Sequence, residues 1–447
     1  MQDIFKDGIR LRSFYSFIYP SIVMIVFMSI NYVIDSIMIA NFLGITAFAA
    51  LNLSYPVESL MWGLSVMPAA GASALVAIII GKGEKEKAGS LFSLICIVAL
   101  AIGLAYMLIV FIFIEPILNL LGATDALKGA CRTYIRLANI GVPFAFVGVM
   151  LSFFIRIDGN PKYTLIMNVA GGVTLIVMDF LFMGFFNWGV EGAAIASVLS
   201  FIVKAFLGLL YFVKYAKTIK FVKPKWDYQF VRKSLVNGSS EMVSECSTGI
   251  VVFVFNLLAL KYAGESGVAS IGIIMNISYL MTSLYFGYAS GVGPLISFYY
   301  GAQKEDIINT IHYWSKNMLI ISAVLLSFLT FTFAGNLVSI YESSGTEVYN
   351  MTITGMRFFA VAMLFTGINI YASGVFTAYG NGIVSAIISF SRSIIFTLSL
   401  SFLFTKILGF NGLWFAICSA EFLTIIISVI CFYIFRKKYN YNFRKIR

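Results

Sequence analysis

Long apolar runs alternate with short polar joints along the whole chain. Each run has about 20 residues or more, which at 1.5 Å per residue is enough to cross the roughly 30 Å hydrocarbon core of a bilayer. The joints, such as GKGEKEKAG at 81–89, hold Gly, Pro and Asn residues that favour turns. The pattern predicts twelve membrane-spanning helices, at residues 14–40, 51–80, 90–114, 134–156, 163–186, 191–214, 236–262, 267–299, 314–334, 355–378, 383–408 and 412–435.

Composition places these helices in a membrane rather than in a soluble core. The chain is 60% hydrophobic and 11% charged, with a mean hydropathy of +0.92, whereas soluble domains contain about 25% charged residues. The first apolar run is too long for the hydrophobic region of a signal peptide, so we expect it to be retained. The five cysteines are scattered, and His312 is the only histidine. We therefore expect an all-α polytopic membrane protein that is not an enzyme and has no metal cluster or cofactor.

Basic residues gather in alternate joints and so predict the orientation of the chain. Most of the 31 lysines and arginines share a side with the N-terminus, including the stretch from Lys204 to Lys233 and the tail from Arg436 to Arg447. The positive-inside rule then predicts a multi-pass protein of the cell membrane with both termini in the cytoplasm. We interpret the net charge of +11 as a topology signal that also contacts anionic membrane lipid, and expect no nucleic-acid partner. Frequent Ile, Phe, Lys and Asn favour a bacterial source.

The two halves of the chain repeat one another. GKGEKEKA at 81 corresponds to GAQKEDI at 301, DGNPKYTLIMN at 158 to YGNGIVSAIIS at 379, and GVEGAAIAS at 189 to GFNGLWFAI at 409, each about 220 residues apart. Six spans is an even number, so both copies enter the membrane from the same side, with a central cavity between them. The repeat predicts two six-helix bundles, an N-lobe at 1–213 and a C-lobe at 234–435, with a basic linker at 214–233 and a basic tail at 436–447.

Two acids lie deep inside apolar runs of the first half. Asp35 is in the run at 14–40 and Asp179 in the run at 163–186. An aspartate at the centre of a membrane helix costs about 2.5–3.5 kcal/mol on insertion scales, which a helix that served only as an anchor would not carry. By residue count, both acids lie roughly 7–12 Å from the outer ends of their helices, at the same depth as Glu58 and Ser197.

This common depth predicts a site for an ion or a proton, and two alternatives remain for it. Carboxylate and hydroxyl oxygens suit a hard cation, so Asp35 and Asp179 can hold Na⁺, and no other metal is expected. Alternatively, one carboxyl group keeps a proton, because two desolvated acids cannot both be charged cheaply. The plainer alternative is that the acids hydrogen-bond neighbouring helices or line water, and Glu58, nearer the rim, can simply be solvated.

The second half carries a different set of charges near mid-membrane, namely Glu245, Arg392 and Glu421. A lone arginine at that depth must pair or face water, so a Glu245–Arg392 or a Glu421–Arg392 ion pair is one interpretation. The other is a cavity wall on which the uncompensated glutamate attracts a cationic substrate. Pro20 lies within the first span, where a missing hydrogen bond permits a kink.

In these features the chain resembles the multidrug and toxic compound extrusion family of antiporters over nearly its whole length. The resemblance rests on NYVIDSIMIANFLG (31–44), GKGEKEKA (81–88), RIDGNPKY (156–163), MDFLFM (178–183), GVEGAAIAS (189–197), NGSSEMVSE (237–245) and PLISFYYGAQ (294–303). The family fold is two six-helix bundles around a V-shaped cavity. Its members exchange Na⁺ or H⁺ for organic, often cationic, compounds.

The resemblance also implies roles for single residues. Asp35 and Asp179 match the first- and fifth-helix acids of the family's N-lobe cation site, Ser197 takes the place of a sixth-helix Thr, and Pro20 matches a proline whose bending accompanies protonation in relatives. Many members have Asn four residues before the fifth-helix acid, where this chain has Leu175. The missing ligand argues against Na⁺ coordination more than against protonation.

Together these features predict a secondary active exporter of amphiphilic organic cations that is driven by Na⁺ or H⁺. Asp35, Asp179 and Ser197 would bind the coupling ion, while Glu58, Glu245, Arg392 and Glu421 would line the cavity or form its charge network. The alternative is a flippase of lipid-linked precursors on a related fold, which would show more basic residues in the cavity. A membrane enzyme would need a nucleophile–base pair, and we find none in the sequence.

Overall fold

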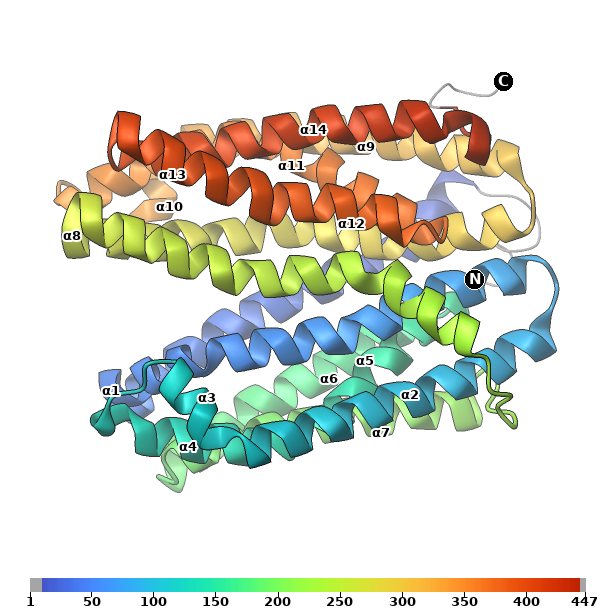
Figure 1. The fold of residues 1–447 in the computed structure, drawn as a ribbon, viewed down its shortest axis with the longest axis horizontal. Helices are drawn as coiled ribbons and strands as arrows, with labels where there is room; N and C mark the ends of the chain where they lie inside the picture. Colours follow the sequence, from blue (N-terminus) through green and yellow to red (C-terminus); the bar gives the residue numbers. More distant parts are fainter. Residues whose placement is uncertain (1–9, 443–447) are drawn as a thin grey trace.

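A computed structural model describes the backbone of residues 10–442 and every side chain in that range except those of Ile45, Thr46, Ala49 and Ala126. The described chain is helical, without strands (Figure 1). Its first half comprises α1 (Leu11–Gly81), α2 (Lys85–Ile112), α3 (Ile114–Leu120), α4 (Asp125–Asn139), α5 (Val142–Ile157), α6 (Pro161–Asp179), η2 (Phe180–Phe185) and α7 (Val190–Lys214). Its second half comprises α8 (Tyr228–Gly301), α9 (Glu305–Thr332), α10 (Ala334–Val338), α11 (Glu347–Ala378), α12 (Gly382–Phe390), η3 (Ser391–Phe396), α13 (Thr397–Leu408) and α14 (Asn411–Tyr439).

These elements make twelve passes along the molecule. Ten described helices are long and apolar enough to cross a membrane, and α4 together with α5 forms an eleventh span. The 74-residue α8 supplies the twelfth, because its backbone leaves helical geometry at Gly264 (φ 62°, ψ −153°). Gly44 (φ 80°, ψ 175°) divides α1 in the same way, at a positive φ that glycine adopts without steric cost. The predicted all-α fold with twelve spans is confirmed.

The fourth span differs from the continuous helix predicted at 134–156. It consists of α4 and α5, which meet at an angle of 51°. The break falls at Ile140 and Gly141, and Pro143 occupies the first turn of α5. Proline has no backbone N–H to donate to the preceding turn, so the helix restarts there instead of continuing.

The basic linker is shorter than the predicted 214–233. Helix α8 already begins at Tyr228, because the side chain of Asp227 accepts a hydrogen bond of 2.9 Å from the backbone N–H of Phe230 and caps the helix. At the other end, α7 ends at Lys214, where the predicted linker begins. The predicted tail at 436–447 is described only to residue 442. Within it, α14 continues to Tyr439.

A buried aspartate fixes the linker to the first bundle. Asp158 accepts hydrogen bonds from the backbone N–H groups of Thr218 (2.8 Å) and Ile219 (2.9 Å) and from the hydroxyl of Tyr211 (2.7 Å). These charge-assisted bonds satisfy a carboxylate that is only 6% exposed. The connection between the two halves is thus packed against the end of the first bundle.

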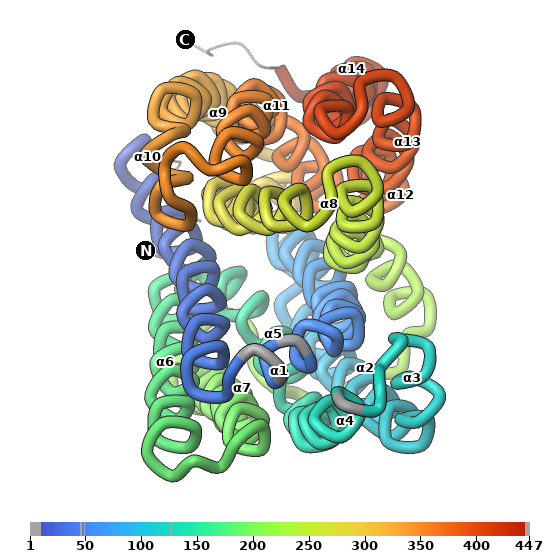
Figure 2. Tube along the Cα trace, turned by 90° about the vertical axis from the view of Figure 1, so that its left-hand side faces the viewer, coloured from blue at the N-terminus to red at the C-terminus, as the bar shows by residue number. Residues whose placement is uncertain are grey.

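The two halves form separate bundles that share one long axis. Figure 2, an end-on view, places α2–α7 below and α8–α14 above. Residue 10, residue 442 and the linker lie at one end of the molecule, here named the terminal end (Figure 1). The breaks at Gly44 and Gly264, with α3 and α10, lie at the opposite end (Figure 1).

Helix α1 belongs to both bundles. Its first turns contribute Phe14, Phe17 and Ile18, all fully buried, to the hydrophobic core of the second bundle. The Phe14 ring lies 5.2 Å from that of Trp314 in α9. Further along, α1 packs in the first bundle against α6, where Gly172 approaches Asn31 closely. One continuous helix therefore connects the interiors of the two lobes.

The lobes touch at the terminal end through glycines. A Cβ atom on Gly81 would lie 2.1 Å from the carbonyl oxygen of Phe298, and one on Gly301 would lie 2.0 Å from that of Ile78. Gly81 and Gly301 occupy corresponding positions of the sequence repeat, so the same feature of each half meets the other half. Arg156 of α5 adds a hydrogen bond to Ser290 of α8. Backbones this close leave no space for a side chain, so the terminal end is closed.

We expect Gly301→Val to open the terminal end, because its side chain would collide with the backbone of α1. Spin labels at Lys85 and Lys304, both exposed, measure the separation of the two lobes there. The label–label distance should lengthen in Gly301→Val. Gly293→Ala is the matched control, since a Cβ on Gly293 meets no atom within 4 Å. A wild-type distance distribution in Gly301→Val would contradict this account of the closure.

Candidate functional site

Two acids from different helices meet inside the first bundle. Asp35 lies in the first part of α1, and Asp179 is the last residue of α6. The Asp179 side chain is fully buried, and neither carboxyl oxygen has a hydrogen-bond partner of good geometry. The partly buried Asp35 is close enough for the two carboxyl groups to interact directly. The structure thus brings together the two acids that lie far apart in sequence.

A tyrosine that the sequence analysis did not select extends this acid pair. Tyr134 of α4 is 9% exposed and lies near Glu58 of α1 and Ser197 of α7. Asp35 is also among its neighbours. The sequence offers no clear signal for it, since Tyr134 is the first residue of the predicted fourth span and the acids were expected deeper in their helices. All the residues predicted at this depth are therefore grouped around one point of the first bundle.

The acid pair lacks a neutralising partner. Among the described residues, no Lys, Arg or His forms an ion pair with Asp35 or Asp179. Two carboxylates in apolar surroundings pay a desolvation cost and also repel each other, so the site favours an added cation or a retained proton. The nearby hydroxyls of Ser197 and Tyr134 are hard oxygen donors of the kind that Na⁺ accepts. Leu175, one turn before Asp179, is partly buried and offers no oxygen.

A π-helical turn follows Asp179 directly. In η2 the backbone N–H of Phe186 donates to the carbonyl of Leu181 at 2.8 Å, five residues back. The Trp188 ring stacks on that of Phe182, with centroids 4.7 Å apart and planes 11° apart. Such turns are rare and frequently lie at functional sites, because the extra residue redirects side chains on the helix. The turn places the end of α6 in a geometry that a regular helix would not give.

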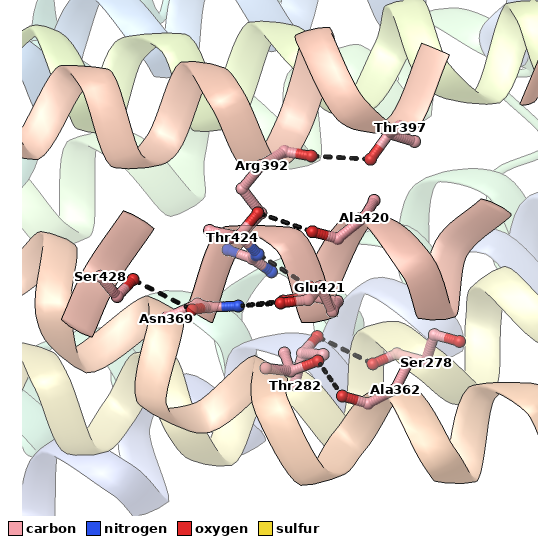
Figure 3. Close-up of polar contacts among 11 residues, drawn as sticks. Ser278, Thr282, Ala362, Asn369, Arg392, Thr397, Ala420, Glu421, Thr424 and Ser428 are labelled. Atoms are coloured by element: carbon pink, nitrogen blue, oxygen red, sulfur yellow. Dashed lines mark hydrogen bonds and ion pairs between the residues drawn. The ribbon is translucent and has the colours of Figure 1, made fainter. Parts of the chain in front are cut away.

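The charges of the second bundle form a paired network (Figure 3). Arg392 donates to Glu421 at 2.8 Å, and the amide of Asn369 donates to the same carboxylate at 2.8 Å. Ser428 donates in turn to the side-chain oxygen of Asn369 at 3.0 Å. Of the two ion pairs considered from the sequence, the structure forms Glu421–Arg392, and Glu245 takes no part. Arg392 itself lies in the second π-helical turn, η3.

Glu245 belongs instead to a cluster between the bundles, here named the inter-lobe cluster and made of Tyr32, Tyr55, Glu58, Glu245 and Tyr279. The rings of Tyr32 and Tyr279 lie 6.0 Å apart, one from each bundle. Tyr55 interacts with all four other members. The two contacting rings are 42% and 51% exposed. Exposed aromatic faces beside carboxylates provide the surroundings that bind organic cations.

Pro20 lies where α1 crosses from one bundle to the other. It is buried, between Ile18, which packs against Gly291, and Ile22, which packs against Gly287, both glycines being in α8. The described backbone of α1 stays helical through Pro20 and departs from helical geometry only at Gly44. Its role as a hinge remains a prediction.

Comparison with known proteins follows the two halves. The family model MatE matches residues 20–181 and 242–403. Multidrug export protein MepA of Staphylococcus saprophyticus is 23% identical over 416 residues, covering 92% of this chain and 91% of that protein. MepA of Staphylococcus aureus is 23% identical over 401 residues, covering 87% and 86%.

Solved structures show the same fold. A crystal structure of MATE in complex with MaL6 superimposes with a TM-score of 0.89, at 20% identity and 96% coverage of both chains. A MATE family transporter of the MOP superfamily, in its outward-facing conformation, gives a TM-score of 0.88 at 20% identity, covering 96% of this chain and 95% of that chain.

The paired network predicts a large cost for removing only one charge. Glu421→Leu leaves the Arg392 charge without its partner in the interior, and we expect a loss of about 3–5 kcal/mol in the free energy of unfolding. The double variant Arg392→Met, Glu421→Leu should recover much of that loss, because it removes both charges. Thermal unfolding of the purified protein measures both variants. A Glu421→Leu protein as stable as wild type would contradict the pairing.

Proposed function

This chain belongs to the MatE family, a family of membrane transporters rather than enzymes, and we propose that it is a secondary active exporter. In this proposal it exchanges Na⁺ or H⁺ for amphiphilic organic cations. The observation that carries the proposal is the buried pair of Asp35 and Asp179, whose charge nothing in the described structure neutralises. Export of drugs is what the name of the staphylococcal relatives states for those proteins.

The coupling ion would bind at Asp35 and Asp179, with Ser197 and Tyr134 contributing oxygens. A bound cation or proton removes the repulsion between the two carboxyl groups and the cost of burying them. Helices α1 and α6 can then pack more closely. Because α1 continues past Pro20 into the core of the second bundle, a shift of α1 in the first bundle changes its contacts with α8. Ion occupancy therefore favours one arrangement of the lobes.

The substrate would bind at the inter-lobe cluster. An organic cation placed there gains from the ring faces of Tyr32 and Tyr279 and from the carboxylate of Glu245. Since these groups come from both bundles, substrate is held well only while the lobes are correctly spaced. Ion and substrate thus favour different states, and each releases the other. The flippase alternative is less favoured, because Glu421 already neutralises the arginine that an anionic lipid precursor would need.

We place the protein in a bacterial cell membrane as a multi-pass protein with both termini in the cytoplasm. The terminal end of the molecule would then face the cytoplasm, and its closure would correspond to an outward-facing state. Phe206, Phe328 and Phe402, which are 63%, 63% and 50% exposed, would face lipid. The lobes at 1–213 and 234–435 would rock against each other around the linker at 214–233.

The ion site is tested by Asp35→Asn in proteoliposomes loaded with a fluorescent cationic dye. Na⁺ and pH gradients are imposed separately, and wild type should move dye with one of them. Asp35→Asn should lose at least about tenfold in ion-driven transport, because the neutral amide no longer needs a cation. Asp125→Asn, at an exposed aspartate of α4, is the control and should behave as wild type. Full ion-driven export by Asp35→Asn would refute the site.

The substrate site is tested by Tyr279→Ala. Loss of one cation–π partner is worth about 0.5–2 kcal/mol, so KM for a cationic dye should rise roughly two- to thirtyfold. The ion dependence of transport should stay unchanged, because Tyr279 is not in the acid pair. Tyr433→Ala, at a tyrosine of α14 that is 80% exposed, is the matched control. An unchanged KM in Tyr279→Ala would place the substrate elsewhere.

A further inference from the structure

Lys204 is a basic residue inside the first bundle, on the side of the acid pair that faces the terminal end. Lys204 stands between Val190 and Lys214 in α7 and is partly buried. A lysine within a membrane helix is expensive and is expected to pair or to serve a function. Among the described residues, no ion pair or hydrogen bond to Lys204 is present. The ion pairs described so far therefore do not include Lys204.

The neighbouring helices are shaped around the stem of this lysine. A Cβ atom on Gly171 of α6 would lie 2.3 Å from Cε and 2.5 Å from Cγ of Lys204. A Cβ on Gly148 of α5 would lie 3.3 Å from its Cβ. Two neighbouring helices therefore have glycine at the positions that contact the lysine side chain. The apolar stem fills that groove, as long basic side chains do when only the charged end needs polar surroundings.

The ammonium group lies toward the start of α7, the part of that helix that also carries Ser197. Nζ lies 5.8 Å from the ring centroid of Phe201, three residues nearer the start of α7, as expected for helical side chains, which lean toward the N-terminus. Ser197 lies one further turn in the same direction. Seven residues of helix separate Lys204 from Ser197, or about 10 Å. Among the described residues, Lys204 forms no ion pair with Asp35 or Asp179.

The other helices around Lys204 bring few charges. From α1 come Asp35 and Glu58, and from α6 comes Asp179, all nearer the opposite end. From α5 comes Arg156, which is already engaged with Ser290 of α8. Helix α7 itself carries Glu191 in its first turn. The acid pair and Glu58 are therefore acids on the neighbouring helices that form no ion pair in the described structure.

We propose that Lys204 is a tethered cation that weakens the binding of the coupling ion at Asp35 and Asp179. A desolvated pair of acids alone would hold Na⁺ or a proton too tightly to release it in each cycle. A fixed positive charge on a residue about two helical turns from Ser197 repels the bound ion and stabilises the empty, charged site. Lys204 is accordingly a positioning residue that acts through the acids, and this inference rests on the proposed ion site.

The test compares Lys204→Met, which keeps an apolar stem in the glycine groove, with Lys204→Arg, which keeps the charge. At an effective dielectric constant of about 20, unit charges about 10 Å apart change a binding constant by roughly ten- to twentyfold. The half-saturating Na⁺ concentration for dye export should therefore fall about tenfold in Lys204→Met. If H⁺ is the coupling ion, the pH of half-maximal transport should rise by about one unit. Lys204→Arg and the control Lys214→Met, at an exposed lysine of the same helix, should match wild type.

A second readout does not depend on transport. The coupling ion stabilises the folded protein that binds it, so the Na⁺ or pH dependence of thermal unfolding in detergent gives the same midpoint. Lys204→Gln serves in place of Lys204→Met if the latter does not fold. If thermal unfolding of wild type depends on the ion but the neutral variants bind that ion no more tightly than wild type, the proposed role of Lys204 is wrong. A wild type that responds to neither ion would instead overturn the proposed exchange itself.

Discussion

The burial of Asp179 without a hydrogen-bond partner is the constraint on which the rest of the first bundle depends. A carboxylate there pays its desolvation cost in full, and Asp35 next to it adds repulsion. The surrounding groups moderate this cost without removing it. The hydroxyls of Ser197 and Tyr134 lie close by, and Lys204 follows Ser197 by about two turns of α7. In the proposed exchange, the bundle has two stable conditions, one with a positive charge bound and one with the acids exposed to water, and its packing differs between them.

In this proposal helix α1 transmits that difference, because it is the element common to both lobes. Its first turns are buried in the core of the second bundle, and Asp35 follows further along the same helix. Pro20 separates these two parts and removes one backbone hydrogen bond between them. At the terminal end, glycines of one lobe contact the backbone of the other. The two lobes are therefore either in contact or separated there, since no side chain would bridge an intermediate distance. Small changes at the acids can thus be converted into closure or opening of a whole end of the molecule.

Periodicity and charge in the sequence were sufficient for the twelve spans and for singling out Asp35 and Asp179, since long apolar runs mark membrane helices and an acid within one stands out. What the sequence could not supply was contact between helices. Tyr134 resembled any aromatic residue at a membrane boundary, and Arg392 had two acids at equal depth from which to choose a partner. Lys204 was counted with the basic residues on the side of the N-terminus, because a residue count does not show what surrounds a side chain. The bend before Pro143 and the turns η2 and η3 arise from tertiary packing, which no local pattern records.

The central claim is that Asp35 and Asp179 together bind one positive charge. Equilibrium binding of radioactive Na⁺ to the purified protein, with proton release followed in the same weakly buffered sample, measures that charge directly. The account predicts one Na⁺ or one exchangeable proton per chain in wild type and none in Asp179→Asn. A protein that binds neither, or an Asp179→Asn variant that binds the same ion as tightly as wild type, would contradict it.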